Sequence, residues 1–182
     1  MLSRIDKLAA LETTIVAASG GKPFLHPDLE KIVDRIRRNG MIATVISNGY
    51  PLTLRRITSL NHAGFDYIQI SIDTLNPDGS SKKSLNALEP KLRMLAENAD
   101  FQVSVNTVMG HAVGNPEDAL VIARRAHEIG FAATVGILHD HDGQLQPLNK
   151  ERKKIYEDIL RMGSPVFSFA QYGRFQKIMN KG

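Results

Sequence analysis

The stretch TTIVAASGGKP, residues 13–23, decides the fold of this chain. Six residues rich in β-branched and small apolar side chains run directly into a turn with two adjacent glycines, which predicts a buried strand followed by a polar loop. Later segments repeat this pattern of an apolar, β-rich run that ends in a polar or glycine-containing loop. They cover residues 41–47, 67–72, 101–108 and 132–138, so we expect five strands.

The segments between these strands show the apolar spacing of amphipathic helices. One helical face comprises Leu29, Ile32, Val33 and Ile36, and a second comprises Ala119, Ile122, Ala123, Ala126 and Ile129. Shorter patterns predict helices over residues 54–60 and 155–162. A further helix is expected over residues 92–99, with its start near Pro90, because proline suits a first helical turn.

Strands that alternate with helices through short connections predict a parallel sheet with right-handed crossovers, either open and doubly wound or part of a barrel. The strands are apolar on both faces, which predicts burial on both sides. The opening SRIDKLAALE, residues 3–12, has the pattern of a helix end that leads straight into the first strand. We therefore expect that a preceding strand is missing, and that the first strand presents an unpaired edge and exposed apolar surface through which the chain could form a homo-oligomer.

Composition narrows the class of protein. A chain of 182 residues with 42% hydrophobic and 23% charged residues predicts one soluble α/β domain over residues 1–182. No apolar run has the length of a membrane span or a secretory signal, so we expect a cytoplasmic protein without a membrane partner. The net charge is +4, but the basic pairs are scattered and aromatic residues make up only 6%, so no nucleic-acid partner is expected.

The absence of cysteine is a chemical constraint on any fold. The chain contains no cysteine, so it can form neither a disulfide, a thiolate zinc site nor a cysteine-ligated cluster from its own residues. It also contains no nucleophile elbow, phosphate-binding loop or dinucleotide fingerprint. Hydrolase and nucleotide-kinase functions therefore lack support.

Ligands of parallel α/β sheets gather at the carboxyl ends of the strands, so the loops that follow each strand are the places to inspect. In chain order these loops and strand ends contain SGGKP (19–23) with HPDL (26–29), ISNGY (46–50), QISID (69–73), SVNTV (104–108) and VGI (135–137). This ordered series strongly resembles the radical S-adenosylmethionine (radical SAM) family. The resemblance covers about residues 1–145, with a C-terminal helix and tail over 146–182, and it implies an incomplete (β/α) TIM-like barrel with parallel strands.

The resemblance also implies a binding site for S-adenosylmethionine. Gly20, Gly21 and Pro23 match a Gly-Gly-Glu-Pro loop whose backbone polar groups meet the methionyl ammonium in that family. Lys22 replaces the acidic residue, and two cations at contact distance repel each other. The remaining positions implied are Asn48, Ser71, Asp73, Asn106, Gly136 and Ile137: Ser71, Asp73 and Asn106 face the ribose or methionine, and Val135-Gly136-Ile137 lies along the adenine.

Each of these positions also has a structural explanation. Asn48 and Gly49 can form a turn, Asp73 can cap the following segment, and Asn106 can satisfy neighbouring backbone groups. These alternatives stay open at this point.

The family motif Cys-x3-Cys-x2-Cys, which follows the first barrel strand, is missing together with that strand. Its three thiolates hold a [4Fe–4S] cluster, which this chain cannot bind by itself. The resemblance thus implies an ancestral iron–sulfur enzyme that binds S-adenosylmethionine, here inactive or truncated at its N-terminus, with that nucleotide still expected as a ligand.

Two other functions are retained as alternatives. One is an independent βα-barrel enzyme that performs metal or acid–base chemistry through Asp73, His139 and Asp140. Only alternate side chains of the run His139-Asp140-His141-Asp142 share a face in an extended loop, so that run supplies fewer ligands than a metal site normally needs. The other alternative is a non-catalytic scaffold or subunit that pairs through the exposed edge of the first strand.

Overall fold

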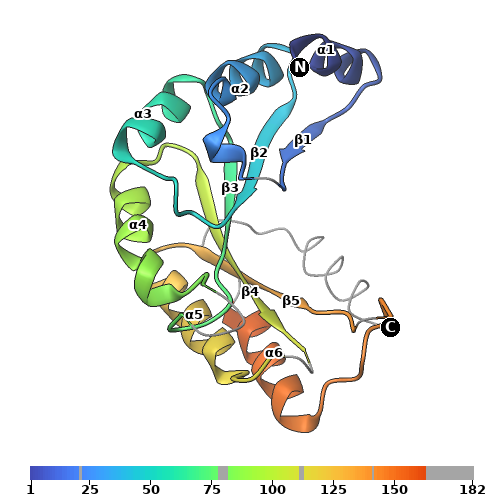
Figure 1. The fold of residues 1–182 in the computed structure, drawn as a ribbon, viewed down its shortest axis with the longest axis vertical. Helices are drawn as coiled ribbons and strands as arrows, with labels where there is room; N and C mark the ends of the chain where they lie inside the picture. Colours follow the sequence, from blue (N-terminus) through green and yellow to red (C-terminus); the bar gives the residue numbers. More distant parts are fainter. Residues whose placement is uncertain (21, 78–81, 111–112, 141, 163–182) are drawn as a thin grey trace. The chain divides into compact units, whose positions relative to one another are not determined.

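The computed structural model describes residues 1–20, 22–77, 82–110, 113–140 and 142–162. Helices and strands alternate along the chain as predicted (Figure 1). The elements are α1 (Leu2–Ala10), β1 (Ile15–Ala18), η1 (Pro23–Leu25), α2 (Leu29–Arg38), β2 (Ile42–Ser47), α3 (Leu54–His62), β3 (Tyr67–Ser71), α4 (Leu85–Asn98), β4 (Gln102–Met109), α5 (Glu117–Glu128), β5 (Ala132–Ile137) and α6 (Lys150–Met162). The strands form one sheet in the order β1-β2-β3-β4-β5, so the predicted five-stranded α/β architecture is confirmed.

The chain forms two compact units, and the first comprises Met1–Ser71 with Leu88–Val103. In this unit β2 pairs in parallel with β1 and with β3. Figure 1 shows α2 and α3 along one side of these strands. On that side Ala43 and Val45 of β2 are buried at 1% exposure, and Ile68 and Ile70 of β3 at 0% and 1%. The helices therefore cover one face of the sheet, as the periodic patterns predicted.

The other face of β1 and β2 differs from the prediction of burial on both sides. Ile15 is 54% exposed, Ile42 37% and Ile46 40%, whereas the alternate residues of β2 are covered. Successive side chains of a strand point to opposite faces, and among the described residues of this unit only the helical side has a covering layer. The expected exposure of apolar strand residues is thus confirmed, while pairing through the edge of β1 stays a prediction.

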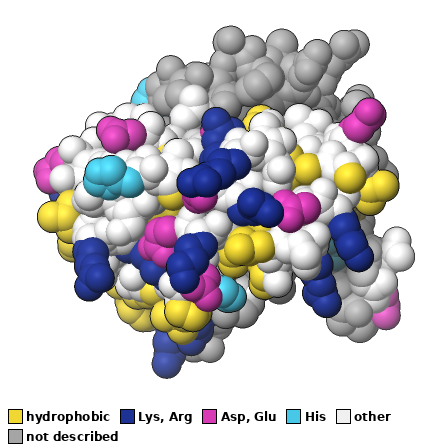
Figure 2. Space-filling view, turned by 90° about the horizontal axis from the view of Figure 1, so that it is seen from above, with side chains coloured by type: hydrophobic (Ala, Val, Ile, Leu, Met, Phe, Trp, Pro, Cys, Tyr) yellow, Lys and Arg dark blue, Asp and Glu magenta, His cyan; other side chains and the backbone are white. Residues whose placement is uncertain are grey.

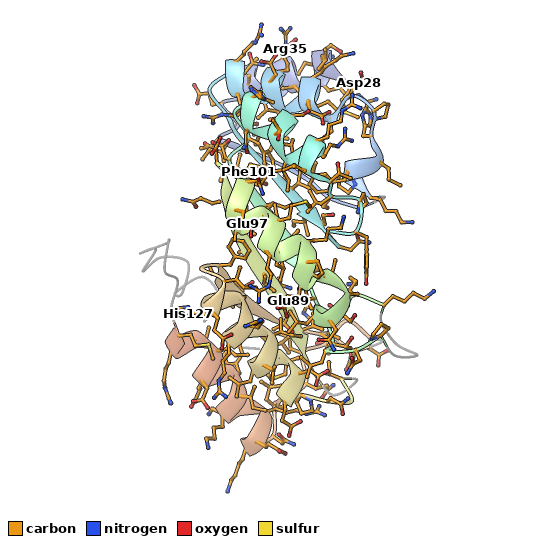
Figure 3. The ribbon with its side chains drawn as sticks, turned by 90° about the vertical axis from the view of Figure 1, so that its left-hand side faces the viewer. Asp28, Arg35, Glu89, Glu97, Phe101 and His127 are labelled. Atoms are coloured by element: carbon orange, nitrogen blue, oxygen red, sulfur yellow. The ribbon has the colours of Figure 1, made fainter. Side chains whose placement is uncertain are left out.

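An ion pair joins the first two helices of this unit. Asp6 of α1 accepts hydrogen bonds from Nε (2.7 Å) and Nη2 (2.9 Å) of Arg35 in α2, and from Nδ2 of Asn39 (3.0 Å). The Arg35 and Asn39 hydrogen bonds lower the pKa of the Asp6 carboxyl. Figure 3 labels Arg35 on its helix, and Figure 2 shows Lys and Arg side chains interspersed with Asp and Glu on the face in view.

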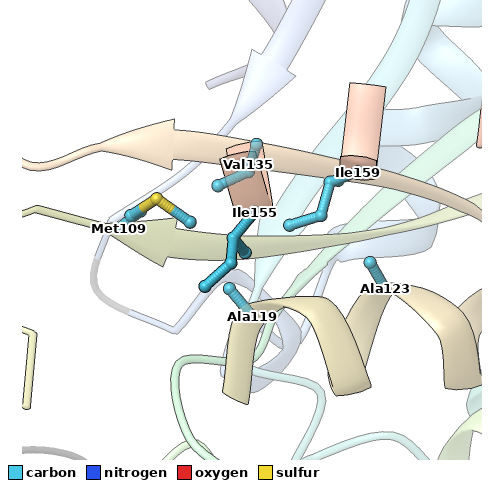
Figure 4. Packing of buried hydrophobic residues seen from close by; sticks show 6 residues of the cluster. All are labelled: Met109, Ala119, Ala123, Val135, Ile155 and Ile159. Atoms are coloured by element: carbon cyan, nitrogen blue, oxygen red, sulfur yellow. The ribbon is translucent and has the colours of Figure 1, made fainter. Parts of the chain in front are cut away.

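The second unit comprises residues 72–87 and the chain from Ser104 onward. Here β4 and β5 pair in parallel, with Asn106 opposite Thr134 and Met109 opposite Ile137. Residues from β4, α5, β5 and α6 meet in one apolar cluster (Figure 4), which consists of Met109, Ala119, Ala123, Val135, Ile155 and Ile159. This cluster forms part of the core of the unit.

Helix α6 begins at Lys150, five residues before the apolar pattern that predicted it. Its first turn is polar, and Arg152 in this turn forms hydrogen bonds with the segment after β4. Nη1 of Arg152 donates to the carbonyl of Gly110 (2.6 Å), and Nη2 donates to the carbonyl of Val113 (3.0 Å). The helix thereby holds the segment that follows β4.

Helix α4 begins at Leu85 and not near Pro90, so the predicted start was wrong. The backbone N–H of Leu85 donates to Thr74 O (2.9 Å) and that of Asn86 donates to Leu75 O (3.1 Å). These bonds to the segment after β3 satisfy donors of the first helical turn and start the helix earlier. Pro90 then lies inside the helix, where its missing N–H costs one helical hydrogen bond.

Helices α2, α3 and α5 are each followed two residues later by a glycine. Gly40, Gly64 and Gly130 have φ angles of 75°, 71° and 95°, a region that only glycine enters without strain. No helix within the described residues combines the length and the apolar character that a membrane crossing requires.

Candidate functional site

The loop after β1 presents a free cation. Gly20 has φ 74°, and Lys22 adopts a left-handed conformation (φ 62°, ψ 72°) that is uncommon outside glycine. The Lys22 side chain is exposed, and no carboxylate of the described residues forms an ion pair with it. Pro23 then begins the short helix η1, and Gly21 lies outside the described residues. The positive charge of Lys22 is therefore available to a ligand.

The loop after β2 has its polar groups engaged in a turn. Asn48 Oδ1 accepts from the backbone N–H of Tyr50 (3.2 Å), and Ser47 Oγ accepts from that of Gly49 (3.1 Å). Gly49 has φ 74°, and a Cβ there would lie 3.3 Å from Ile70. The geometry agrees with the structural explanation for Asn48. Ser71, the last residue of β3, is half-buried in the same unit.

The carboxyl end of the sheet in the second unit brings together Asn106, Thr134 and Gly136. Thr134 Oγ1 donates to Asn106 Oδ1 at 2.8 Å, which fixes the orientation of the amide. A Cβ on Gly136 would lie 4.0 Å from Asn106 Nδ2 and 3.9 Å from Thr107 O, so the missing side chain leaves this amide uncovered. Nδ2 itself has no acceptor among the described residues. The arrangement offers a fixed donor beside an open stretch of strand backbone.

The outer edge of β5 adds further backbone groups to this arrangement. The N–H of Leu138 donates to Met109 O (2.7 Å), so the neighbouring residues Val135 and Ile137 direct their own polar groups away from β4. In the described part of the chain no strand pairs with that edge. A flat heterocycle with its own donor and acceptor nitrogens can hydrogen-bond there.

Asp73 lies beside this group and is tied to the segment that follows it. Its Oδ2 is 2.8 Å from Nζ of Lys83, and its N–H donates to the carbonyl of Lys83 (2.8 Å). The preceding residue, Ile72, donates its N–H to Asn106 O at 2.9 Å. The Asp73 side chain, 14% exposed, thus forms an ion pair close to the Asn106 strand.

In the loop after β5, the side chain of Asp140 accepts hydrogen bonds from other residues of the loop. Asp140 Oδ2 accepts from the side chain of Gln146, and Oδ1 accepts from the N–H groups of Gln144 (2.8 Å) and Asp142 (3.0 Å). These bonds, led by that from Gln146, lower the pKa of Asp140. Within the described ranges, which omit His141, no three His, Cys, Asp or Glu side chains could hold one metal ion. His139 and Asp140 thus gain no support as metal ligands.

Two residues of the site went unnoticed in the sequence. Thr134 orients Asn106, and Lys83 pairs with Asp73. Thr134 could have been found, because it precedes Gly136 by two residues and so shares its face of the strand. No comparable signal marks Lys83, because its contact depends on how the chain returns after β3.

Curated proteins with similar sequences include GTP 3',8-cyclase of Aquifex aeolicus, which is 29% identical over 145 residues and is matched over 74% of this chain and 45% of its own length. AdoMet-dependent heme synthase of Methanosarcina barkeri is 27% identical over 138 residues, with coverage of 71% and 38%. The chain therefore spans less than half the length of these relatives.

Similar solved structures share the fold. SuiB of Streptococcus suis bound to S-adenosylmethionine matches with a TM-score of 0.64 at 13% identity, over 87% of this chain and 39% of that chain. A domain of pyruvate-formate lyase-activating enzyme from Bacteroides vulgatus matches with a TM-score of 0.61 at 18% identity, over 81% and 92%. The fold is the partial TIM-like barrel of radical SAM proteins.

The family binds S-adenosylmethionine together with a [4Fe–4S] cluster that cysteine thiolates hold. These 182 residues contain no cysteine, so they do not fit the cluster, whereas the open backbone and free amide of the second unit fit a nucleoside. The family model for the Radical SAM superfamily matches residues 1–144. This chain belongs to the radical SAM superfamily.

Proposed function

We propose that this chain binds S-adenosylmethionine through its adenosyl group, and that its own residues do not support radical chemistry. The observation that carries the proposal is the Asn106 amide, which Thr134 orients and which Gly136 leaves uncovered. The free Nδ2 donor suits a ribose or adenine acceptor, and the outward backbone groups of Val135 and Ile137 suit the edge of an adenine ring. With no thiolate among these residues, no step through a cluster is assigned to them.

Calorimetric titration with S-adenosylmethionine and with 5'-methylthioadenosine, which lacks the methionyl group, tests the proposal. Asn106→Ala removes the free donor and should weaken both ligands about tenfold, the effect of losing one hydrogen bond. Asn115→Ala, at an exposed asparagine of the loop before α5, is the matched control and should bind as the natural chain does. The proposal fails if the folded natural chain binds neither ligand.

Position 22 should set the balance between the two ligands. In radical SAM proteins the corresponding loop meets the methionyl ammonium, and here it presents the cation of Lys22, which pairs with no carboxylate in the part of the chain that the structure describes. Lys22→Glu replaces repulsion by attraction and should raise the affinity for S-adenosylmethionine about tenfold while that for methylthioadenosine stays the same. The fold should tolerate this change because the side chain is exposed.

Lys7→Glu, on the exposed face of α1, controls for the change in net charge. An equal gain for both ligands, or a gain with Lys7→Glu as well, would show that position 22 does not face the methionyl group.

A further inference from the structure

The guanidinium of Arg56 connects helix α3 to the segment that follows the two-glycine turn. Nη2 donates to the carbonyls of Phe24 (2.7 Å) and His26 (2.8 Å). Nη1 donates to both carboxylate oxygens of Glu30 in α2, at 2.8 Å and 3.1 Å. One planar side chain thus joins α3, α2 and the end of η1.

The position of Arg56 in its helix is electrostatically unfavourable. Thr53 caps α3 through its hydroxyl, which accepts the N–H of Arg56 (3.2 Å), so this cation lies in the first helical turn. The amino end of a helix carries a positive partial charge and disfavours cations. The Glu30 carboxylate offsets this cost, and the pair is sheltered, with side-chain exposures of 21% and 24%. Local helix preference therefore does not account for an arginine here.

The other hydrogen bonds of the segment that Arg56 holds come from nearby residues of the chain: the His26 carbonyl also accepts the N–H of Leu29 (3.4 Å), and His26 Nδ1 accepts that of Asp28 (3.1 Å). Phe24 is buried at 3% exposure, whereas the next residue, Leu25, is 62% exposed. The backbone bonds from Leu25 N to Lys22 O (2.9 Å) and from His26 N to Pro23 O (3.0 Å) form the single turn of η1. By fixing the carbonyls at both sides of Leu25, Arg56 orients this turn and hence the backbone at Lys22.

We propose that Arg56 is a positioning residue for the ligand loop, defined here as residues 22–25. Its guanidinium donates hydrogen bonds to the carbonyls of Phe24 and His26. By fixing this part of the loop, it determines where residue 22 meets the ligand. The part of this inference that concerns a ligand rests on the function proposed above, whereas the part that concerns the loop does not.

Hydrogen exchange measured on the full chain tests the loop directly. Arg56→Lys keeps the charge, but a single ammonium cannot reach the carboxylate and both carbonyls in the fork geometry of a guanidinium. The amides of Leu25 and His26 should then exchange at least about tenfold faster, as expected when a turn loses charge-assisted anchoring. Arg55→Lys, at the exposed neighbouring position of α3, should leave both rates unchanged.

A second variant separates loop anchoring from loss of the ion pair. Glu30→Gln removes the carboxylate but leaves the Arg56 bonds to the Phe24 and His26 carbonyls. It should retain the slow exchange of the Leu25 and His26 amides, even if Arg56→Lys proves too unstable to compare. Faster exchange in Glu30→Gln, or unchanged exchange in a folded Arg56→Lys, would overturn the proposal.

The ligand part is tested by a double-mutant cycle between positions 22 and 56. The gain in affinity for S-adenosylmethionine that Lys22→Glu produces should disappear in Lys22→Glu/Arg56→Lys and persist in Lys22→Glu/Arg55→Lys. Affinity for methylthioadenosine should stay the same in all of them, which a general loss of stability would not allow. Equal weakening of the binding of both ligands would overturn the positioning role. If neither the natural chain nor any variant binds either ligand, the proposed function fails. The exchange rates of Leu25 and His26 then decide the role of Arg56 by themselves.

Discussion

Replacement of Ile122 by alanine should lower the free energy of unfolding by about 2–5 kcal/mol, the range for large-to-small changes in a packed core. Ile122 is completely buried on α5, on the apolar face that includes Ala119, Ala123 and Ala126. Removal of its three outer carbon atoms leaves a cavity, because the methyl groups of the neighbouring alanines on α5 are too short to move into it. Urea denaturation followed by circular dichroism measures the change.

Val121→Ala provides the control for this result. Val121 precedes Ile122 on the same helix but is 43% exposed, so its truncation should change stability by no more than about 0.5 kcal/mol. Similar losses for the two variants would mean that α5 is not packed against the sheet through the face described.

Replacement of Gly110 by alanine should lower the free energy of unfolding by about 2 kcal/mol, because it combines a strained backbone with a tight contact against Leu138. Gly110 has φ 154°, and a Cβ there would lie 3.2 Å from both the Cβ and the carbonyl oxygen of Leu138. The carbonyl of Gly110 also accepts the hydrogen bond from Arg152, so the residue cannot shift without loss of that bond. Thermal and urea denaturation would both report the change.

Gly114→Ala, in the same loop, is the matched comparison. Among the described residues other than its chain neighbours, no atom lies within 4 Å of its hypothetical Cβ, and its φ lies outside the region that favours glycine. Its stability should therefore equal that of the natural chain within experimental error. A neutral Gly110→Ala would show that the loop after β4 can move away from β5 at no cost.

The strands and most helices were predictable because their signals are local. Gly40, Gly64 and Gly130 end helices with positive φ angles, and the apolar spacing of α2 and α5 matches their buried faces. The start of α4 was not predictable, since it depends on hydrogen bonds to Thr74 and Leu75 that no helix-forming pattern encodes.

The candidate site divides in the same way. Asn106 and Gly136 were found from their order along the chain, and the alternation of β5 could have added Thr134. The partners of Asp73 and of the loop after β1 were hidden, because Lys83 and Arg56 occur in segments whose side-chain directions are set only by tertiary packing. Whether one face of β1 and β2 is exposed depends on how many layers cover the sheet. The apolar sequence of a strand does not reveal that number.

Helix α6 lies beyond residue 144, where similarity to the family model ends, yet Ile155 and Ile159 belong to the apolar core cluster of the second unit. The segment that matches the family model therefore ends before the segment that the core of the second unit requires. A gene fragment cut at the limit of similarity would uncover Met109 and Val135 and release the Gly110 carbonyl from Arg152. The sequence of α6 is thus constrained by the apolar volume that Ile155 and Ile159 must fill.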